Sequence, residues 1–223
     1  MSGPAVSGTD EQTARRALVE ACRAMNALGI NQGTSGNISV RHGGVMLISP
    51  SATSYEAMRP DQVAAMALDD APGADGWHGP LKPSTEWRFH RDILRARPDF
   101  GAVVHSHPTF CTALAIARRD IPPCHYMVAA FGGADIRCAD YATFGTQELS
   151  DHALRALEGR NGCLLANHGM IVCAPTLDRA MWLAVELEAI ARQYYHSLLI
   201  GGPHVLSDAQ IADTAREFAT YGI

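Results

Sequence analysis

The chain has 223 residues, of which 47% are hydrophobic and 18% charged, and its formal net charge is −5. This length supports one sizeable core, so we expect a single domain over residues 11–223 behind a flexible leader, residues 1–10. The acidic balance, with no basic block, argues against nucleic acid as a partner. No apolar run is long enough to span a bilayer and the first residues do not resemble a signal peptide, so we also expect no membrane partner.

A helix capped by Thr9 or Asp10 is expected to run to about Leu28. A hairpin around a Gly43–Gly44 turn follows it. The elements predicted as far as the middle of the chain are strands over 38–41, 45–48 and 61–68, a polar loop over 69–79, a helix over 84–96, a buried strand over 102–105 and a helix over 108–117.

Short apolar runs predict four further strands, and amphipathic runs predict three further helices. The strands are expected over 127–130, 136–139, 163–166 and 170–173, and the helices over 146–157, 176–199 and 208–221. The strands alternate with helices without a strict βαβ rhythm. The pattern therefore predicts an α/β fold of three layers, α/β/α, with a mixed, largely antiparallel central sheet.

The six cysteines form no Cys-x-x-Cys pair, and most of them lie among apolar residues. This usage is typical of buried free thiols rather than of disulfides, and it fits a reducing compartment. We therefore expect a cytoplasmic protein with free thiols at Cys22, Cys111, Cys124, Cys138, Cys163 and Cys173.

Two histidines, His105 and His107, stand at i and i+2 at the end of an apolar run. On a strand such side chains share one face, so both rings can bind one ion. His168 interrupts a second apolar run, where a buried polar group needs a partner. Glu86, near a helix start, can add a carboxylate, although an acidic residue there also suits the helix dipole. Three imidazoles and a carboxylate together predict zinc or a similar divalent metal.

The other histidines need no function in this interpretation. Six of them lie in segments that resemble exposed surface, and we expect no metal ligand among His42, His78, His90, His152, His196 and His204.

Three segments rich in small hydrogen-bond donors predict an anion site: Thr34–Asn37, Ser49–Ser51 and Ser84–Thr85, with Lys82 adjacent to the last. Backbone N–H groups in turns and at a helix N-terminus favour phosphate. Each segment alone also suits ordinary turn chemistry. Because the third segment runs directly into Glu86, the three together predict a phosphate held beside the metal.

Six short motifs occur in a fixed order: Gly36–Ser39, Ser84–His90, Val104–His107, His125–Met127, Tyr141–Thr146 and Asn167–Gly169. This order resembles the class II aldolase/adducin-head family, over about residue 12 to Tyr221. The ligand motifs are common to the whole family. The motifs that begin at His125 and Tyr141 are more particular to its fuculose-phosphate aldolase branch.

The resemblance implies a ligand set and a phosphate pocket. One zinc ion per subunit would be held by Glu86, His105, His107 and His168, and other divalent transition metals could use the same ligands. Ala52 stands where the aldolase branch has Gly, and Thr85 where it has Ser, and both residues keep a phosphate pocket plausible. The pocket would be lined by Gly36, Asn37, Ser51, Ala52, Ser84 and Thr85.

The resemblance also implies how the site is completed. Tyr126 would be the proton donor lent by a neighbouring subunit of a C4 homotetramer whose active sites lie at subunit interfaces. Phe144 and Tyr221 would close over the aldehyde end of the substrate. Glu86 would leave the metal when substrate binds and act as the base.

The implied reaction is the reversible cleavage of a ketose 1-phosphate, L-fuculose 1-phosphate or a close analogue. The products would be dihydroxyacetone phosphate and a small aldehyde such as L-lactaldehyde. Zinc would act as a Lewis acid on the developing negative charge. The partner implied is thus a phosphorylated sugar.

Other reactions of the family stay open. An aldolase for 5-deoxy- or 5-methylthio-ribulose 1-phosphate would differ only in its aldehyde pocket. A ribulose-5-phosphate 4-epimerase would use the same metal, but that branch carries an acidic residue where this chain has Tyr126. A dehydratase or a decarboxylase is a further alternative. Adducin heads, which are non-catalytic interaction modules, lack the metal ligands that this chain keeps.

Overall fold

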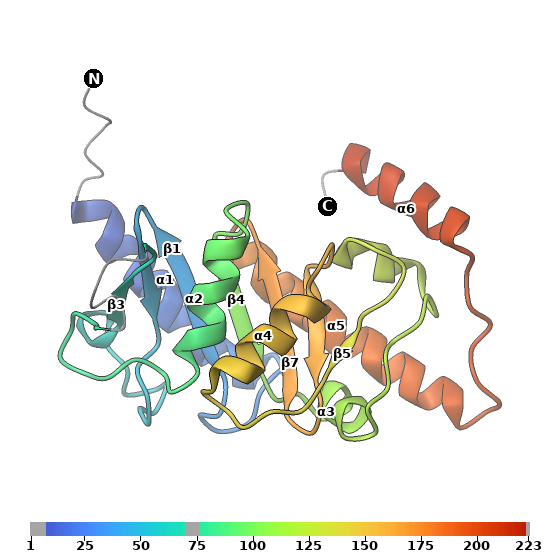
Figure 1. The fold of residues 1–223 in the computed structure, drawn as a ribbon, viewed down its shortest axis with the longest axis horizontal. Helices are drawn as coiled ribbons and strands as arrows, with labels where there is room; N and C mark the ends of the chain where they lie inside the picture. The colour runs from blue at the N-terminus through green and yellow to red at the C-terminus, as the bar shows by residue number, and fades with distance from the viewer. Residues whose placement is uncertain (1–7, 70–75, 222–223) are drawn as a thin grey trace.

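The computed structural model describes residues 8–69 and 76–221, and it places a seven-stranded sheet between two layers of helices (Figure 1). The strand order is β3-β2-β1-β4-β7-β6-β5. The strands are β1 (Asn37–His42), β2 (Val45–Ile48), β3 (Ala64–Ala67), β4 (Ala102–Ser106), β5 (Cys138–Ala139), β6 (Gly162–Leu165) and β7 (Gly169–Ala174). The helices are α1 (Gly8–Ala27), α2 (Trp87–Ala96), α3 (Thr109–Ile116), α4 (Gln147–Ala156), α5 (Leu177–Leu198) and α6 (Asp208–Tyr221), with 3-10 turns η1 (Pro60–Gln62) and η2 (Tyr126–Phe131).

All neighbouring strands pair antiparallel except β5 and β6, which are parallel. The expected mixed, largely antiparallel sheet is therefore confirmed. The central strand β4 lies between β1 and β7, and its register sets His105 opposite Asn37 on one side and opposite Ile171 on the other. The middle of the sheet thus brings three distant segments together.

The two faces of the sheet carry separate apolar cores. One core includes Leu18 of α1 and Leu187 of α5, and the other includes Phe89 of α2. Successive residues of β4 alternate between them, since Val103 belongs to the second core and Val104 to the first. Helices α2 and α4 pack on each other over one face, and α1, α3 and α5 cover the opposite face (Figure 1). The predicted three layers are confirmed.

One predicted strand is wrong. Residues 127–130 belong to the 3-10 turn η2, which packs against α5 and α6 and ends at Gly132 in the left-handed conformation. All of the residues from Met127 to Phe131 are buried. A short run that is buried on every side has no periodicity to separate strand from helix, and this is why the sequence misleads here.

Several predicted boundaries also shift. Residues 136–139 contribute only Cys138–Ala139 as a strand, while Ile136 makes an isolated bridge to Ile121. Residues 61–68 divide into η1 and β3, and the helix expected from residue 84 begins at Trp87.

The ends of the chain and the cysteines can be compared with expectation as well. Helix α1 begins at Gly8, so residues 8–10 of the expected leader are helical, and residues 1–7 lie outside the described part. All six cysteines are free, as predicted, and four of them are buried. Among the described residues no helix is long and apolar enough to cross a membrane.

Candidate metal centre and substrate cleft

The three predicted histidines converge on one point. His105 lies in β4 and His107 directly follows it, while His168 lies in the turn between β6 and β7. Their ring centroids are 4.8 to 4.9 Å apart, and the Nε2 atoms of His105 and His107 are 3.0 Å apart. The ligand atoms of all three lie within 4.8 Å of one another. The i, i+2 argument from the sequence thus holds in three dimensions.

Glu86 completes this cluster from the helical layer. It precedes α2 and is buried, with Oε2 3.2 Å from Nε2 of His105 and Oε1 3.2 Å from Nε2 of His168. Oε2 also accepts a hydrogen bond from Nδ2 of Asn37, at 2.9 Å. The predicted ligands Glu86, His105, His107 and His168 are therefore brought together from three separate segments.

Close backbone packing makes this convergence possible. A Cβ atom on Gly169 would lie 2.4 Å from the Ser106 carbonyl oxygen and 2.7 Å from Cδ2 of His107. Asn167, the residue before His168, has φ of 57°, a left-handed value that Asn tolerates better than most residues. The turn that presents His168 consequently needs a glycine on one side and favours an asparagine on the other.

The protonation of the cluster follows from its burial. Burial, and then the neighbouring imidazoles, lower the pKa of His107 to about 3. Burial and His105 likewise lower the pKa of His168 to about 4. Burial acts to raise the pKa of Glu86, but His105, His168 and the Asn37 amide outweigh it and hold that pKa below its usual range. The cluster therefore contains a carboxylate, together with neutral rings at His107 and His168.

These donors fit a divalent transition metal. Nδ1 of His105 donates to the Met170 carbonyl oxygen, 2.8 Å away, which leaves its Nε2 directed at Nε2 of His107, 3.0 Å away. Oε1 of Glu86 is buried without a hydrogen-bond partner among the described residues. Converging lone pairs and an unpaired carboxylate oxygen repel one another unless a cation lies between them. Nitrogen and oxygen donors of this kind suit zinc.

Three of the four predicted ligands, Glu86, His107 and His168, line a cleft of about 410 Å³ that also gathers the predicted anion segments. No lysine or arginine is among its described lining residues, and Lys82 is not one of them. Hydroxyl groups, backbone N–H groups and a bound cation are thus the available partners for an anion here. The lining consists of Thr34, Ser35, Gly36, Asn37, Pro50, Ser51, Ala52, Ser84, Thr85, Glu86, His107, Phe144 and His168.

Two residues of the cleft occupy backbone positions that favour glycine. Gly36 lies against β4, where a Cβ atom would be 2.8 Å from the His105 carbonyl oxygen. Ala52 has φ of 51°, a left-handed value that glycine adopts at no steric cost. The residue type at position 52 therefore departs from the one its backbone favours.

The aldehyde-end residues are placed less uniformly. Phe144 lines the cleft and is 62% exposed, on a loop that Arg88 holds by donating from Nη1 to the Gly145 carbonyl oxygen at 2.9 Å. Tyr126 is not among the lining residues. It lies in η2, is 50% exposed and packs near Phe218 of α6. Tyr221 is the last residue of α6, and its side chain lies outside the described part.

One histidine is buried where the sequence predicted an exposed position. His90 was expected at the surface, but it is fully buried, with its ring stacked on Phe89 at 4.7 Å. Its ring nitrogens lie 2.8 Å from Oγ of Ser39 and 2.5 Å from Oδ1 of Asn37. The spacing of four residues from Glu86, one helical turn, is the sequence signal that could have identified it.

Comparison with known proteins agrees with this geometry. Residues 16–195 match the family described as Class II Aldolase and Adducin N-terminal domain. The chain belongs to this family. It is 51% identical over 208 residues to a 5-methylthioribulose-1-phosphate/5-deoxyribulose-1-phosphate aldolase of Rhodospirillum rubrum, covering 93% of this chain and 92% of the relative.

Two further relatives point the same way. The chain is 46% identical over 210 residues to the L-fuculose phosphate aldolase of Escherichia coli K12, covering 93% of this chain and 95% of that protein. A solved L-fuculose 1-phosphate aldolase matches with a TM-score of 0.88 at 32% identity, covering 96% of this chain and 98% of that one. The chain is thus a class II aldolase, which makes it a lyase.

Proposed function

We propose that this aldolase binds one zinc ion per subunit and reversibly cleaves a ketose 1-phosphate to dihydroxyacetone phosphate and a small aldehyde. The observation that carries the proposal is the cluster of Glu86 and the three histidines in a cleft lined by hydroxyl and backbone donors. A zinc ion held by these four residues supplies a Lewis acid for the negative charge that develops on the substrate oxygens.

Glu86 moves the proton on the dihydroxyacetone phosphate side of the broken bond. Its carboxylate is ionised, buried and adjacent to two of the metal-binding rings. In condensation this carboxylate removes a proton from the carbon of dihydroxyacetone phosphate that becomes C3. In cleavage it first takes up a proton from a hydroxyl group of the bound substrate and then delivers a proton to C3 of the enediolate. A carboxylate at hydrogen-bond reach of the reacting carbon is the arrangement that general acid–base chemistry needs.

The phosphate end of the substrate is held by the hydroxyl and amide groups that line the cleft. Asn37, Ser51, Ser84 and Thr85 supply amide, hydroxyl and backbone donors, together with the backbone at Gly36 and Ala52. Neutral donors of this kind orient a phosphate without burying a fixed cation. Binding energy from this remote group aligns C3 and C4 of the sugar with Glu86.

The aldehyde end is completed by a second subunit. Tyr126 is absent from the lining of its own cleft, and the element that carries it packs against α6. Helix α6 lies at the upper right of Figure 1, whereas α3, which follows His107, lies at the lower edge. We therefore assign Tyr126 to the cleft of a neighbouring subunit in a homotetramer, where its hydroxyl exchanges the proton of the C4 oxygen. Phe144 and Tyr221 cover the aldehyde.

The natural substrate is L-fuculose 1-phosphate or the 5-deoxy- or 5-methylthio-ribulose 1-phosphate for which the Rhodospirillum rubrum relative is named. All of these ketoses release an aldehyde with an apolar end, which the exposed ring of Phe144 suits. Free thiols throughout the chain are consistent with our expectation of a cytoplasmic enzyme.

The test is aldol cleavage of these three ketose 1-phosphates, with dihydroxyacetone phosphate measured by a coupled assay. We expect release that stops with a chelator and returns with added zinc, and the fastest substrate identifies the aldehyde. Release of no dihydroxyacetone phosphate from any of them would overturn the proposal. Conversion of ribulose 5-phosphate to xylulose 5-phosphate would instead favour the epimerase.

A further inference from the structure

A chain of hydrogen bonds leads from the interior of the sheet to Glu86. Ser39 of β1 lies with its Oγ 2.8 Å from Nδ1 of His90, and Nε2 of His90 is 2.5 Å from Oδ1 of Asn37. The Nδ2 group of Asn37 then donates to Oε2 of Glu86 at 2.9 Å. Each of these four residues is at least 95% buried, since their exposed fractions range from 0 to 5%.

The chain arises from two matching repeats. Asn37 and Ser39 stand at i and i+2 on β1, a separation of about 6.7 Å along a strand. Glu86 and His90 stand at i and i+4, a separation of about 6 Å along a helix. The two pairs therefore match in spacing and face each other. The hydrogen-bonded chain alternates between residues of the strand and residues of the helix, in the order Ser39, His90, Asn37, Glu86.

The direction of each hydrogen bond is fixed by chemistry. Burial lowers the pKa of His90 to about 3, so the ring is neutral and carries one proton. Oδ1 of Asn37 only accepts, so that proton is on Nε2, and Nδ1 accepts from the Ser39 hydroxyl. The Asn37 amide is thereby turned with its NH2 group toward Glu86. The opposite orientation would set an amide oxygen against a carboxylate oxygen.

We propose that His90 is a positioning residue of this aldolase: its Nε2–H, set by Ser39, orients the Asn37 amide so that the Glu86 carboxylate stays aimed at the three histidines. A metal-ligating carboxylate that also works as a base must return to one place after each turnover, and an outer hydrogen bond provides that. The inference rests on the proposed function, because Glu86 has its two roles there.

The test compares substitutions that keep and remove the Nε2 donor. The amide NH2 of glutamine can occupy the place of Nε2 in His90→Gln, whereas His90→Leu has no donor. Ser39→Ala removes the hydroxyl that selects the tautomer. Ser150→Ala is the matched control, since Ser150 is a fully buried serine that donates to Oδ2 of Asp92 at 2.7 Å, outside the chain of bonds.

We expect His90→Leu to lower kcat by roughly 10- to 100-fold and to weaken zinc affinity by a similar factor, with a smaller change in KM for the ketose phosphate. His90→Gln should recover most of both losses, and Ser39→Ala should lie between. Ser150→Ala should leave kcat and zinc affinity unchanged. A glutamine variant that folds yet performs no better than leucine, or a leucine variant with wild-type kcat, would overturn the inference.

A measurement without turnover separates this inference from the proposed function. Histidine labelled with ¹⁵N in the wild type should show the His90 ring as a neutral Nε2–H tautomer from pH 5 to 9, and Ser39→Ala should change its shifts. An Nδ1–H tautomer would overturn the inference even if His90→Leu fails to fold. If the wild type cleaves no ketose phosphate, the proposed function fails, while tautomer and zinc affinity still test the hydrogen-bond chain.

Discussion

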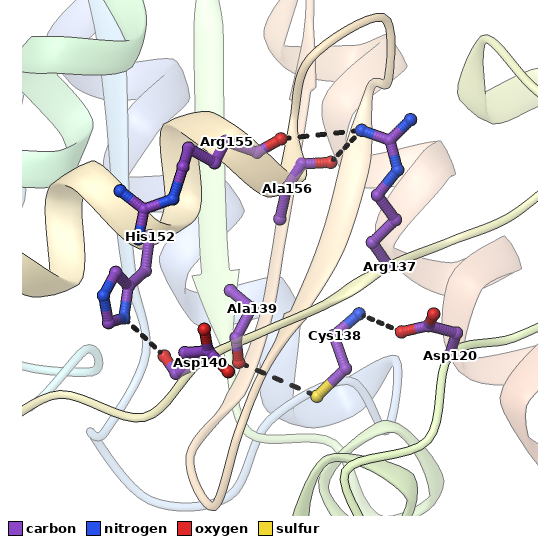
Figure 2. Close-up of a pocket in the computed structure, with 8 residues that line it drawn as sticks. All are labelled: Asp120, Arg137, Cys138, Ala139, Asp140, His152, Arg155 and Ala156. Atoms are coloured by element: carbon purple, nitrogen blue, oxygen red, sulfur yellow. Dashed lines mark hydrogen bonds between the residues drawn. The ribbon is translucent and has the colours of Figure 1, made fainter.

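Two hollows of this molecule contain histidine, carboxylate and cysteine or hydroxyl groups, and they differ in how those groups are paired. One is the cleft around Glu86 and the three histidines, of about 410 Å³. The other, which we call the Asp120 hollow, is about 270 Å³ and is drawn in Figure 2. The Asp120 hollow is lined by Asp120, Arg137, Cys138, Ala139, Asp140, His152, Arg155 and Ala156.

The polar groups of the Asp120 hollow largely satisfy one another. Figure 2 shows Nη1 of Arg137 directed at the carbonyl oxygens that end α4, Nδ1 of His152 at the Asp140 carbonyl, and Oδ1 of Asp120 at the Cys138 N–H. These contacts secure β5 and the end of α4. They leave no set of converging lone pairs among the described groups, and no metal-ligand cluster forms there.

The Glu86 cleft has the opposite property. The Nε2 atoms of His105 and His107 lie 3.0 Å apart, and Oε1 of Glu86 is buried without a hydrogen-bond partner among the described atoms. Leaving such groups unpaired costs free energy unless a ligand joins them. The two hollows differ less in residue type or cavity size than in hydrogen bonding. The Glu86 cleft has converging polar atoms that lack partners, and the Asp120 hollow does not.

The largest expected effect comes from removing one ring of the cleft. His107→Ala should abolish aldol cleavage and sharply weaken zinc retention, because only two histidines hold the metal once Glu86 leaves it to act as the base, one ligand fewer than catalytic zinc sites use. His152→Ala, the matched change in the Asp120 hollow, should leave zinc content and kcat unchanged. Metal analysis after dialysis and the coupled assay measure both. Full activity of His107→Ala without metal would contradict the zinc mechanism.

The second prediction tests whether the cleft needs another subunit. Tyr126→Phe should retain zinc and lower kcat by roughly 100-fold or more, since a general acid contributes about 10²- to 10⁴-fold. Because Tyr126 is assigned to a neighbour's cleft, co-expressing Tyr126→Phe with His107→Ala should restore activity. Random mixing gives roughly a quarter of the sites an intact pair.

The control for this mixture is each variant purified alone, and the tetramer is checked by light scattering. Mixed enzyme no more active than its parents would contradict the intersubunit assignment. Wild-type kcat in Tyr126→Phe would remove Tyr126 as a proton donor.

The ligand set was more accessible to sequence reasoning than the residues behind it. The i, i+2 spacing of His105 and His107 carries its own geometry, because a strand has only one way to place them. Asn37 of β1 lies opposite His105 of β4. This pairing depends on the register between two strands that are far apart in the sequence, and no local sequence pattern predicts that register. The sequence therefore predicts the four candidate ligands but not the hydrogen bonds that Asn37 and His90 make behind Glu86.

His90 shows the same limit from the other side. A neighbouring Arg88 and Arg91 make its segment resemble exposed helix, and only the packing of α2 on the sheet buries the ring. The strand order and the three layers were predictable because alternation and helix signals are local. The 3-10 turn at Tyr126–Phe131 was not, since burial on all sides removes the periodicity.

The third prediction concerns the backbone contact that closes the cleft. Gly169→Ala places a Cβ atom against the Ser106 carbonyl and the His107 ring, so those groups must shift. We expect a loss of about 1–3 kcal/mol in the free energy of unfolding and at least tenfold weaker zinc binding. Gly44→Ala, where a Cβ would meet nothing within 4 Å, should change neither by much. Equal effects of the two substitutions in urea unfolding and zinc competition would contradict the assignment.

The smallest expected effect lies in the Asp120 hollow. Burial, and then the charge of Asp120, raise the pKa of the Cys138 thiol to about 11, and Oδ1 of Asp120 accepts from the Cys138 N–H at 2.7 Å. Asp120→Asn keeps an oxygen acceptor but removes the negative charge, so the thiol pKa falls and more thiolate is present at pH 8. Alkylation of Cys138, followed by mass spectrometry, should therefore speed up about threefold, a shift of about half a pKa unit. Because burial is the larger cause, the Cys138 thiol should still react more slowly than a free thiol.

Turnover should not change in Asp120→Asn, since the charge of Asp120 serves the fold at β5 rather than the cleft. A loss of aldol cleavage in this variant would mean that the two hollows are coupled. It would contradict the view that the Asp120 hollow has only a structural role.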